Sequence, residues 1–379
     1  MQQRVLICRS NAIAPDPRVE KIARTLANTD RSVTVIGWDR FQSQPKIEYF
    51  DKYIVQRLPI KGKFGTGLRN LPALIKWQFS LLYILIKNSR SYDVYHCCDF
   101  DTIIPGLIAK SLFRKHVVYD IFDFYSDSLR NTPDIIKTLI RKLEIYAINI
   151  SDAVILVDDI RIQQISDSNP SELTIIYNSP VDHYSELTVH VQESKSKHLT
   201  ITYVGQLQKE RGLIELVEVV KTQPQWHLQI GGYGGDEEEL KEISSRIPNV
   251  TWHGQINYEK TLKLSAQSDV LIATYDPTVP NHKYSSPNKV FEAMMLGKPL
   301  IAARGSNIDK LIEKYRFGII VAYGNKTDLI KALNYLEANP DYRKKLGNNA
   351  RLAYENNFSW DIMESRLISL YDNLSHSRS

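Results

Sequence analysis

The sequence has 379 residues, of which 43% are hydrophobic and 24% charged, with a formal net charge of +5. This composition excludes a disordered or fibrous chain and is typical of a globular protein long enough for two domains. The apolar run at residues 5–8 is too short for a signal peptide, and the longest run, near residues 81–86, is far below the ~20 residues of a membrane-spanning helix. The three cysteines predict no disulfide framework, and no Cys/His spacing matches a zinc site. We therefore expect a cytoplasmic protein.

Positive charge is concentrated near the amino terminus. Residues 1–90 contain 16 basic and 6 acidic residues, and residues 52–90 contain no acidic residue. Within this window, residues 68–86 mix aliphatic, aromatic and cationic side chains at helical spacing. Such a segment is typical of a helix packed on a core, or of a helix lying on an anionic membrane surface at the inner face of the membrane, and both interpretations stay open. Nucleic acid is not expected as a partner because no recognised binding motif accompanies the charge.

Strands and helices are expected to alternate along the first half of the chain. Strands are predicted at residues 4–8, 33–36, 94–97, 117–119, 154–157 and 174–176, and helices at 16–27, 102–111 and 134–149. Repeated strand–helix–strand units at this spacing form a parallel sheet. The polar stretch 183–198 is predicted to be a linker.

A second series of the same kind follows the linker. Strands are predicted at residues 199–204, 226–230, 250–253, 270–273, 300–303 and 318–321, with helices between them and a final helix from residue 360. The predicted fold class is α/β, with two Rossmann-like doubly wound domains facing across a cleft. The expected domains are residues 1–182, with helix 360–379 packing back on them, and residues 199–359. Ligands of such folds bind at the carboxyl ends of the strands.

One helix of the second half is well marked. In the sequence YSSPNKVFEAMMLGKPLI at residues 284–301, Ser286 is predicted to cap a helix and Pro287 to lie in its first turn. The polar side chains that follow, those of Asn288, Lys289 and Glu292, share one arc of this helix. A helix that begins in this way can hold an anion at its amino-terminal end, and a glutamate one turn further on can accept hydrogen bonds from a diol.

Two loops are expected beside this helix. Residues 205–212 follow the first strand of the second half, and they combine glycines with the cations Lys209 and Arg211, which suit a diphosphate. The glycines Gly232 and Gly234 follow the next strand. Each signal is weak by itself, but their convergence at one edge of a sheet favours a nucleotide-diphosphate ligand.

Taken together, these motifs give the second half a family resemblance. It resembles the retaining glycosyltransferases of family 4, which have the two-domain GT-B architecture. The similar features are the loop GQLQKERG at 205–212, the strand end GYG at 232–234, and the run SPNKVFEAM followed by GKPLI at 286–301. In the first half, DPRVE at 16–20, YDIFD at 119–123 and IYN at 176–178 are also similar. The resemblance covers nearly the whole chain.

The resemblance implies a role for particular residues. Glu292 matches a glutamate that binds the donor ribose, Arg211 matches a basic residue that contacts the donor phosphates, and residues 285–287 match a segment whose backbone amides hold the diphosphate. The implied donor-binding residues are Gly205, Gln206, Arg211, Gly232, Gly234, Ser285, Ser286, Pro287, Asn288, Lys289 and Glu292. The implied catalytic residues are Asp123, Arg211 and Lys289, and the candidates on the acceptor side are Asp16, Arg18, Asp99 and Phe122.

Three positions depart from the pattern of the family. Tyr284 stands where the first glutamate of a Glu-x7-Glu pair is expected, Gln206 where many members carry an arginine, and Phe122 where many carry a histidine. These departures concern the sugar end of the donor and the acceptor side more than the nucleotide. The resemblance implies transfer with retention and without a metal or other cofactor.

The function expected from these observations is transfer of a sugar from a nucleotide-diphosphate donor to a glycan or lipid-linked acceptor in cell-surface polysaccharide biosynthesis. A nucleotide-sugar epimerase of the same architecture and a non-catalytic nucleotide-sugar-binding protein stay open as alternatives. A single-domain, metal-dependent transferase using Asp99 and Asp101 does not account for the second strand–helix series. A dehydrogenase is not expected, because no Gly-x-Gly-x-x-Gly opens the first domain.

Overall fold

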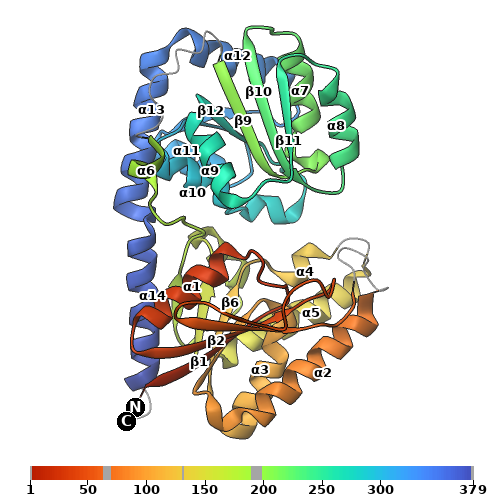
Figure 1. Cartoon of the computed structure of the whole chain (residues 1–379), viewed down its shortest axis with the longest axis vertical. Helices are drawn as coiled ribbons and strands as arrows, with labels where there is room; N and C mark the ends of the chain where they lie inside the picture. Colours follow the sequence, from red (N-terminus) through yellow and green to blue (C-terminus); the bar gives the residue numbers. More distant parts are fainter. Residues whose placement is uncertain (1, 63–69, 130–131, 189–198, 377–379) are drawn as a thin grey trace. The chain divides into compact units, whose positions relative to one another are not determined.

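The computed structural model of the chain describes residues 2–62, 70–129, 132–188 and 199–376. The chain divides into two compact units, which are labelled by element in Figure 1. Unit 1 comprises Met1–Tyr177 and Met363–Ser379, and unit 2 comprises Asn178–Ile362. Part of the predicted linker forms the short helix α6 (Tyr184–Thr188), whereas residues 189–198 lie outside the described residues, as do residues 63–69 of the basic window.

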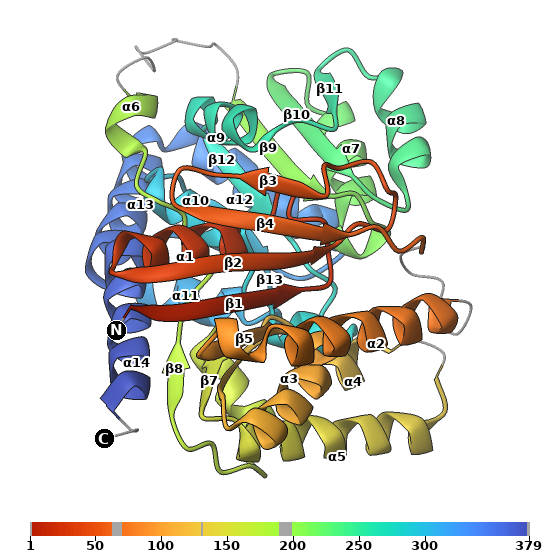
Figure 2. The ribbon, with the colours of Figure 1, turned by 60° about the horizontal axis from the view of Figure 1, so that its bottom comes forward.

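Unit 1 is built on an eight-stranded sheet in the order β3-β4-β2-β1-β5-β6-β7-β8, visible in Figure 2. Neighbouring strands are parallel except β3, which runs antiparallel to β4. The strands are β1 (Gln3–Arg9), β2 (Arg31–Trp38), β3 (Ile47–Tyr49), β4 (Tyr53–Leu58), β5 (Val94–Cys98), β6 (His116–Ile121), β7 (Ala153–Leu156) and β8 (Leu173–Ile175). The edge strand β3 and its neighbour β4 were not expected from the sequence. In β4 buried and half-buried residues alternate, which is a weaker pattern than the continuous apolar runs of central parallel strands.

The helices of unit 1 pack their apolar sides on this sheet. They are α1 (Pro17–Asn28), α2 (Leu71–Lys87), α3 (Phe100–Phe113), α4 (Tyr125–Ser128), α5 (Asp134–Ile150) and the greater part of α14 (Trp360–His376). The terminal helix is held in this unit by polar contacts as well as by packing. The buried Tyr371 hydroxyl lies 2.8 Å from His96 Nδ1, and Arg366 donates to the Ile175 carbonyl at 2.9 Å.

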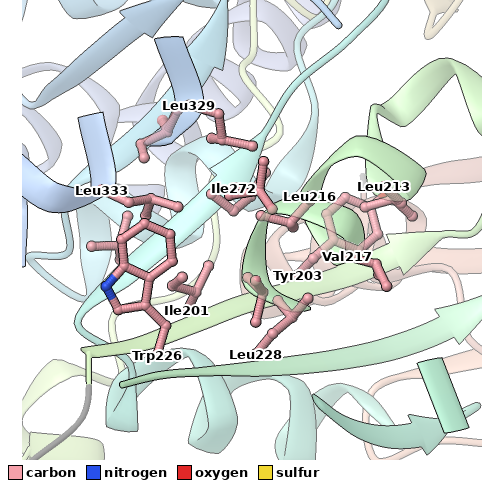
Figure 3. Packing of buried hydrophobic residues seen from close by; sticks show 14 of the residues in the cluster. Ile201, Tyr203, Leu213, Leu216, Val217, Trp226, Leu228, Ile272, Leu329 and Leu333 are labelled. Atoms are coloured by element: carbon pink, nitrogen blue, oxygen red, sulfur yellow. The ribbon is translucent and has the colours of Figure 1, made fainter. Parts of the chain in front are cut away.

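Unit 2 is built on a six-stranded, wholly parallel sheet in the order β11-β10-β9-β12-β13-β14. The strands are β9 (Leu199–Gln206), β10 (Trp226–Tyr233), β11 (Val250–Gly254), β12 (Val270–Ala273), β13 (Leu300–Ala303) and β14 (Gly318–Val321). The helices are α7 (Leu213–Lys221), α8 (Glu237–Ser245), α9 (Tyr258–Gln267), α10 (Asn288–Met295), α11 (Ile308–Tyr315), α12 (Lys326–Ala338) and α13 (Pro340–Ala353). Figure 3 shows part of the core, where Trp226 packs with Ile201 and Leu333.

The order of the strands identifies one place in each sheet where a ligand site is expected. In unit 2 the chain starts at β9, adds β10 and β11 on one side, and then returns to add β12, β13 and β14 on the other. In unit 1 the corresponding reversal lies between β1 and β5. The loops leaving the two strands at such a reversal diverge and open a crevice at their carboxyl ends.

The start of α10 differs from the prediction. Asn288 is its first residue, and Pro287, with φ of −77° and ψ of 143°, occupies the capping position without a side-chain hydrogen bond to the helix. Ser286 is therefore one position too early to be the N-cap. Its carbonyl oxygen instead accepts a hydrogen bond of 3.0 Å from Asn178, which fixes the loop before the helix.

Candidate functional site

The reversal in unit 2 carries a cation stacked on an aromatic ring. The Arg211 guanidinium, at the end of the short helical turn Lys209–Arg211, lies 4.0 Å from the centre of the Tyr275 ring, just beyond β12. Thr274 donates to the Arg211 carbonyl at 2.6 Å, and Arg211 Nη2 donates to Gln206 Oε1 at 3.3 Å. Residues that follow β9 and β12 therefore fix Arg211 at the crevice between these strands.

A second cation lies at the same place. Lys289, in the first turn of α10, has its Nζ 3.4 Å from the centre of the Tyr203 ring and 6.0 Å from that of Tyr275. A Cβ at Gly205 would lie 3.0 Å from this Nζ, so the absence of a side chain there lets the lysine pack against the β9 backbone. Three expected donor residues, Gly205, Arg211 and Lys289, are thus brought together.

The nitrogens of this cationic pair have unused hydrogen-bonding capacity. Within the described parts of the chain, Arg211 Nε, Arg211 Nη1 and Lys289 Nζ are buried and have no hydrogen-bond partner. Burial, with a smaller contribution from the neighbouring Arg211 charge, holds the pKa of Lys289 well below its usual value. Buried donors are normally paired, so three unpaired nitrogens at one strand reversal indicate a site for an anionic ligand with several acceptor oxygens.

The free backbone N–H groups at the start of α10 are not those that the sequence predicts. The N–H of Ser285 already donates to the His282 carbonyl at 3.1 Å, and Pro287 has no N–H. The first N–H groups of a helix have no partner within the helix, so Asn288 and Lys289 are the residues that offer free amides here. Asn288 is also exposed at this end, and the free amides therefore lie just after the expected segment 285–287.

Glu292 lies one turn further along α10 and is buried, with 6% of its surface exposed. Its carboxylate accepts a hydrogen bond from the Tyr258 hydroxyl, and burial together with this negative charge raises the pKa of Tyr258 well above its usual value. A carboxylate has about four acceptor positions, so Glu292 can bind a diol while it keeps the tyrosine. Tyr258 was not expected at the site, because at the start of a predicted helix it carried no sequence signal.

Other expected donor residues have a structural explanation. A Cβ at Gly232 would lie 1.8 Å from the Gly205 carbonyl oxygen, and one at Gly234 would lie 2.2 Å from the Leu207 carbonyl oxygen. These glycines allow two neighbouring strand ends to approach each other. Lys209 pairs with Glu239 at 2.8 Å, and both side chains are about half exposed. Tyr284 is half-buried at the end of the short helical turn Pro280–Tyr284.

The reversal in unit 1 carries a mixed-charge cluster around Arg9, the last residue of β1. Arg9 pairs with Asp16 at 3.0 Å and with Asp99, and its guanidinium lies 4.0 Å from the centre of the Phe122 ring. Asp99 Oδ1 accepts hydrogen bonds from the N–H groups of Phe122 at 2.8 Å and Asp123 at 3.3 Å. Three of the four acceptor-side candidates are thus brought together by an arginine that sequence reasoning missed. Its position at the carboxyl end of a buried strand was the available signal.

The carboxyl group of Asp99 has an altered acidity. Burial raises the pKa of Asp99 to about 6, and the nearby charges of Asp101 and Asp123 act in the same direction, while Arg9 opposes them. Asp99 also has a φ of 64°, which is uncommon for a residue with a side chain. Strained backbone and shifted acidity together are typical of functional positions.

The remaining candidates of unit 1 have partners that define their place. Arg18, the fourth acceptor-side candidate, forms a buried ion pair of 2.8 Å with Asp120 and donates to the Ile176 carbonyl at 2.7 Å. Asp123 is about half exposed and pairs with Arg161 at 2.7 Å. Arg18 is therefore a structural cation beneath the cluster, whereas Asp123 lies at its surface.

One group of potential metal ligands occurs among the described residues, namely the buried side chains of His96, Cys98 and Asp120. The His96 ring already contacts Tyr371 at 2.8 Å and Asp120 at 3.3 Å, and Asp120 also pairs with Arg18. These contacts engage both ring nitrogens of His96 and the carboxylate of Asp120, and we assign no metal to the group.

Comparison with known proteins shows the fold of the whole chain and a family likeness within its second unit. Residues 186–353 match the family described as glycosyl transferases group 1. The matched residues lie within unit 2 and make up less than half of the chain. The strand reversal with Arg211 and Lys289 lies inside the matched residues, as do α10 and Glu292.

Several curated proteins are similar to the chain. An uncharacterized glycosyltransferase of Haemophilus influenzae is 26% identical over 171 residues, which cover 43% of this chain and 46% of that protein. The chain thus spans under half the length of this relative and, at 44%, of a similar protein from Methanocaldococcus jannaschii. A D-inositol 3-phosphate glycosyltransferase of Corynebacterium jeikeium is 21% identical, with 82% of this chain and 79% of that protein covered.

Solved structures show the fold. Sucrose-phosphate synthase from Thermosynechococcus elongatus aligns with a TM-score of 0.82 at 16% identity, covering 99% of this chain and all of that one. HepE of Anabaena, solved in complex with UDP-glucose, aligns with a TM-score of 0.71 at 15% identity, covering 98% and 100%. The chain therefore has the two-domain α/β GT-B fold, as predicted. In the part of the chain that the structure describes, no helix is long and apolar enough to cross a bilayer.

Proposed function

We propose that the chain transfers a sugar from a nucleotide-diphosphate donor to a glycan or lipid-linked acceptor, with retention at the anomeric carbon, in cell-surface polysaccharide biosynthesis. The observation that carries this proposal is the set of three buried, unpartnered nitrogens of Arg211 and Lys289 at the strand reversal of the glycosyltransferase domain. They have the charge and the free donors that a diphosphate requires. The family match supports transfer over the epimerase and binding-protein alternatives.

In this proposal, three parts of unit 2 hold the donor. Arg211 and Lys289 bind the diphosphate, the free amides of Asn288 and Lys289 at the start of α10 add hydrogen bonds, and Glu292 accepts from the ribose hydroxyls. UDP-sugars are the first donors to test, because HepE was solved with UDP and with UDP-glucose.

The chemical requirement is to stabilise the negative charge that grows on the leaving diphosphate. The bond from the anomeric carbon to the diphosphate oxygen breaks, the acceptor oxygen forms its bond to that carbon, and the acceptor proton goes to the departing phosphate. Two cations and the start of a helix, fixed before the reaction, supply the field that this charge needs. We therefore propose that the reaction depends on these protein groups and needs no metal ion.

On the acceptor side, we propose that the cluster around Arg9 binds hydroxyl groups. Asp99 and Asp123 are acceptors of hydrogen bonds, and Asp123 is the more exposed of the two on its side chain. The ring of Phe122, covered by two arginines, is an apolar surface within this cluster. An acceptor with several hydroxyls, such as a sugar, suits such a mixture.

The test is a transfer assay on the purified chain. Binding of a panel of nucleotide sugars is first measured by thermal shift, since a ligand at about 100 times its Kd adds about 2.7 kcal/mol of stability. The donor that binds is then incubated with glycan and lipid-linked acceptors, and nucleotide-diphosphate release and the anomeric configuration of the product are measured. Acceptor-dependent release with retention is expected. Release without any acceptor favours an epimerase, and binding without release favours a non-catalytic protein.

A further inference from the structure

Three helices of unit 1 have an apolar stripe on the side that faces away from the core. In α2, Trp77, Leu81 and Leu85 are buried, whereas Phe79 and Tyr83 are 70% and 62% exposed. The residues on this outer side of α2 are Leu71, Ile75, Phe79, Tyr83 and Ile86. At about 100° per residue, the stripe lies on the opposite side of the helix from the buried residues. A helix that packs only on a core needs a single apolar side.

The same arrangement recurs on α5. Its residues Ala147 and Ile148 are buried, while the outer side carries Ile135, Leu139, Leu143 and Tyr146, with Leu139 58% exposed. These four residues follow the spacing i, i+4, i+8 and i+11, which is one face of a helix. Two helices of one unit therefore present a second apolar face.

The helix α3 connects these two faces. The Asp101 carbonyl in α3 accepts hydrogen bonds from Trp77 at 2.9 Å and Gln78 at 2.7 Å in α2, and Lys110 in α3 donates to the Ile150 carbonyl at the end of α5 at 2.7 Å. Figure 2 shows the three helices on the same side of the sheet. The outer residues of α3 are also apolar, with Leu112 61% exposed. Single exposed apolar residues are common, but a run of them over three adjacent helices marks an interaction surface.

Positive charge accompanies this surface. Lys76 and Lys87 in α2 and Lys142 in α5 are exposed, and within the described residues none of them has an ion-pair partner. No acidic residue occurs in α2. In α3 and α5 the acidic residues are Asp101, Asp134 and the buried Glu144, whose carboxylate accepts from the Tyr125 and Ser126 N–H groups. Unpaired lysines beside aromatic and aliphatic side chains are complementary to a surface with negative head groups above an apolar interior.

We infer that the outer faces of α2, α3 and α5 form a docking surface for an anionic lipid bilayer. The aromatic and aliphatic side chains enter the boundary between head groups and acyl chains, and the lysines contact the anionic head groups. The surface lies in unit 1 and does not depend on the donor site of unit 2. If the proposed function holds, the membrane-bound chain reaches a lipid-linked acceptor in the same bilayer.

The experiment is flotation of the full chain with lipid vesicles, in the absence of any donor. Vesicles of phosphatidylcholine with phosphatidylglycerol are compared with vesicles of phosphatidylcholine alone. The chain is expected to float with the anionic vesicles only. Near an anionic surface each lysine contributes ~1 kcal/mol, so K76Q/K87Q/K142Q is expected to weaken binding by about a hundredfold. F79S/L139S is expected to abolish binding, and low salt does not restore it.

Matched variants in unit 2 serve as controls. K260Q/K331Q/K344Q removes three exposed lysines, and L352S removes an exposed apolar side chain. Both are expected to float like the parent chain. Equal losses in the control and surface variants, or no flotation of the parent chain, would overturn the inference. So would a dimer in light scattering that F79S/L139S converts to a monomer, because the surface would then bind a second copy. Thermal shift with UDP reports on the donor site separately, so a failure of docking and a failure of the proposed function are distinguishable.

Discussion

The Nζ of Lys289 lies 3.4 Å from the centre of the Tyr203 ring, so a helix-borne cation packs on the face of an aromatic side chain from the central strand β9. Tyr203 is buried, and its hydroxyl donates to the Gln206 carbonyl at 2.6 Å, which fixes the ring. The ring attracts the cation but supplies no hydrogen-bond acceptor, so the ammonium is held in place with its donors free. This is the arrangement expected of a cation that binds an anionic ligand.

The first prediction concerns this lysine and the uptake of a proton. Because burial and Arg211 lower the pKa of Lys289, part of the population loses its charge above that depressed pKa, and a bound diphosphate restores it. UDP binding is therefore expected to take up a proton between the depressed pKa and the ordinary value for lysine. Calorimetry in buffers of different ionisation enthalpy measures this uptake. K289M is expected to abolish it, and an unchanged uptake in K289M would contradict the assignment.

The same variant gives a second prediction, on stability. The folded state binds fewer protons than the unfolded state between the depressed and the ordinary pKa of Lys289, so its contribution to the free energy of unfolding rises as the pH rises through this window. Below the window the buried charge lowers stability in full. K289M removes this cost and is expected to raise the free energy of unfolding at neutral pH by about 1 kcal/mol while it weakens UDP binding. Denaturant unfolding measures the change in stability, and UDP titrations of the same proteins measure the change in affinity. A lower free energy of unfolding for K289M would contradict a desolvated ammonium in the parent chain.

The third prediction compares two cations of one loop. Arg211 has free nitrogens at the crevice, whereas Lys209 pairs with Glu239 on the exposed surface. R211Q is expected to weaken UDP binding by about ten- to a hundredfold, since a hydrogen bond to a charged group contributes about 1.5–3 kcal/mol. K209Q is the matched control and is expected to change affinity by less than about threefold. Equal effects of the two variants on the UDP dissociation constant would remove Arg211 from the diphosphate site.

The fourth prediction separates the ribose from the diphosphate. Glu292 is assigned to the ribose, so E292Q and E292A are expected to weaken UDP binding by about tenfold or more and to leave inorganic pyrophosphate binding unchanged. R211Q is expected to weaken both. Competition of each ligand with a fluorescent nucleotide measures the two affinities. E292Q keeps a hydrogen-bond acceptor for Tyr258, so it controls for unfolding of the site. If E292Q weakened pyrophosphate binding as much as UDP binding, Glu292 would not be the ribose ligand.

The fifth prediction concerns the acidic side chain at the reversal of unit 1. Because the pKa of Asp99 is raised to about 6 in the folded state, the folded state holds more protons than the unfolded state between pH ~4 and ~6, and the stability contributed by Asp99 falls as the pH rises through this window. D99N is therefore expected to gain stability relative to the parent chain from pH ~4 to ~6, by at most about 3 kcal/mol. Thermal melts over this range measure the gain. A constant difference between the two proteins would show that Asp99 titrates normally.

The sequence predicted the central strands better than the edges and the loops. The strands β12, β13 and β14 have the predicted bounds, because continuous apolar runs are local properties. The strands β3 and β4 were missed, since β3 is short and has no buried residue, and β4 only alternates buried with half-buried residues. For residues 68–86 the sequence leaves open both a helix packed on a core and a helix lying on a membrane surface. The structure shows that this helix has both a buried and an exposed apolar side.

The sequence by itself determined which residues stand at the carboxyl ends of the strands, and therefore which loops could meet. Gly205, Arg211, Lys289 and Glu292 could all be named in advance, because strand ends and helix starts are marked by local composition. Only the tertiary structure decided what each of them does. Lys209 and Arg211 are two residues apart and alike in charge, yet one pairs on the surface and the other stacks on Tyr275 with its nitrogens free. The physical reason is that burial and pairing depend on neighbours brought from other strands, and Tyr203, Tyr258 and Arg9 become neighbours of the sites only when the sheets form.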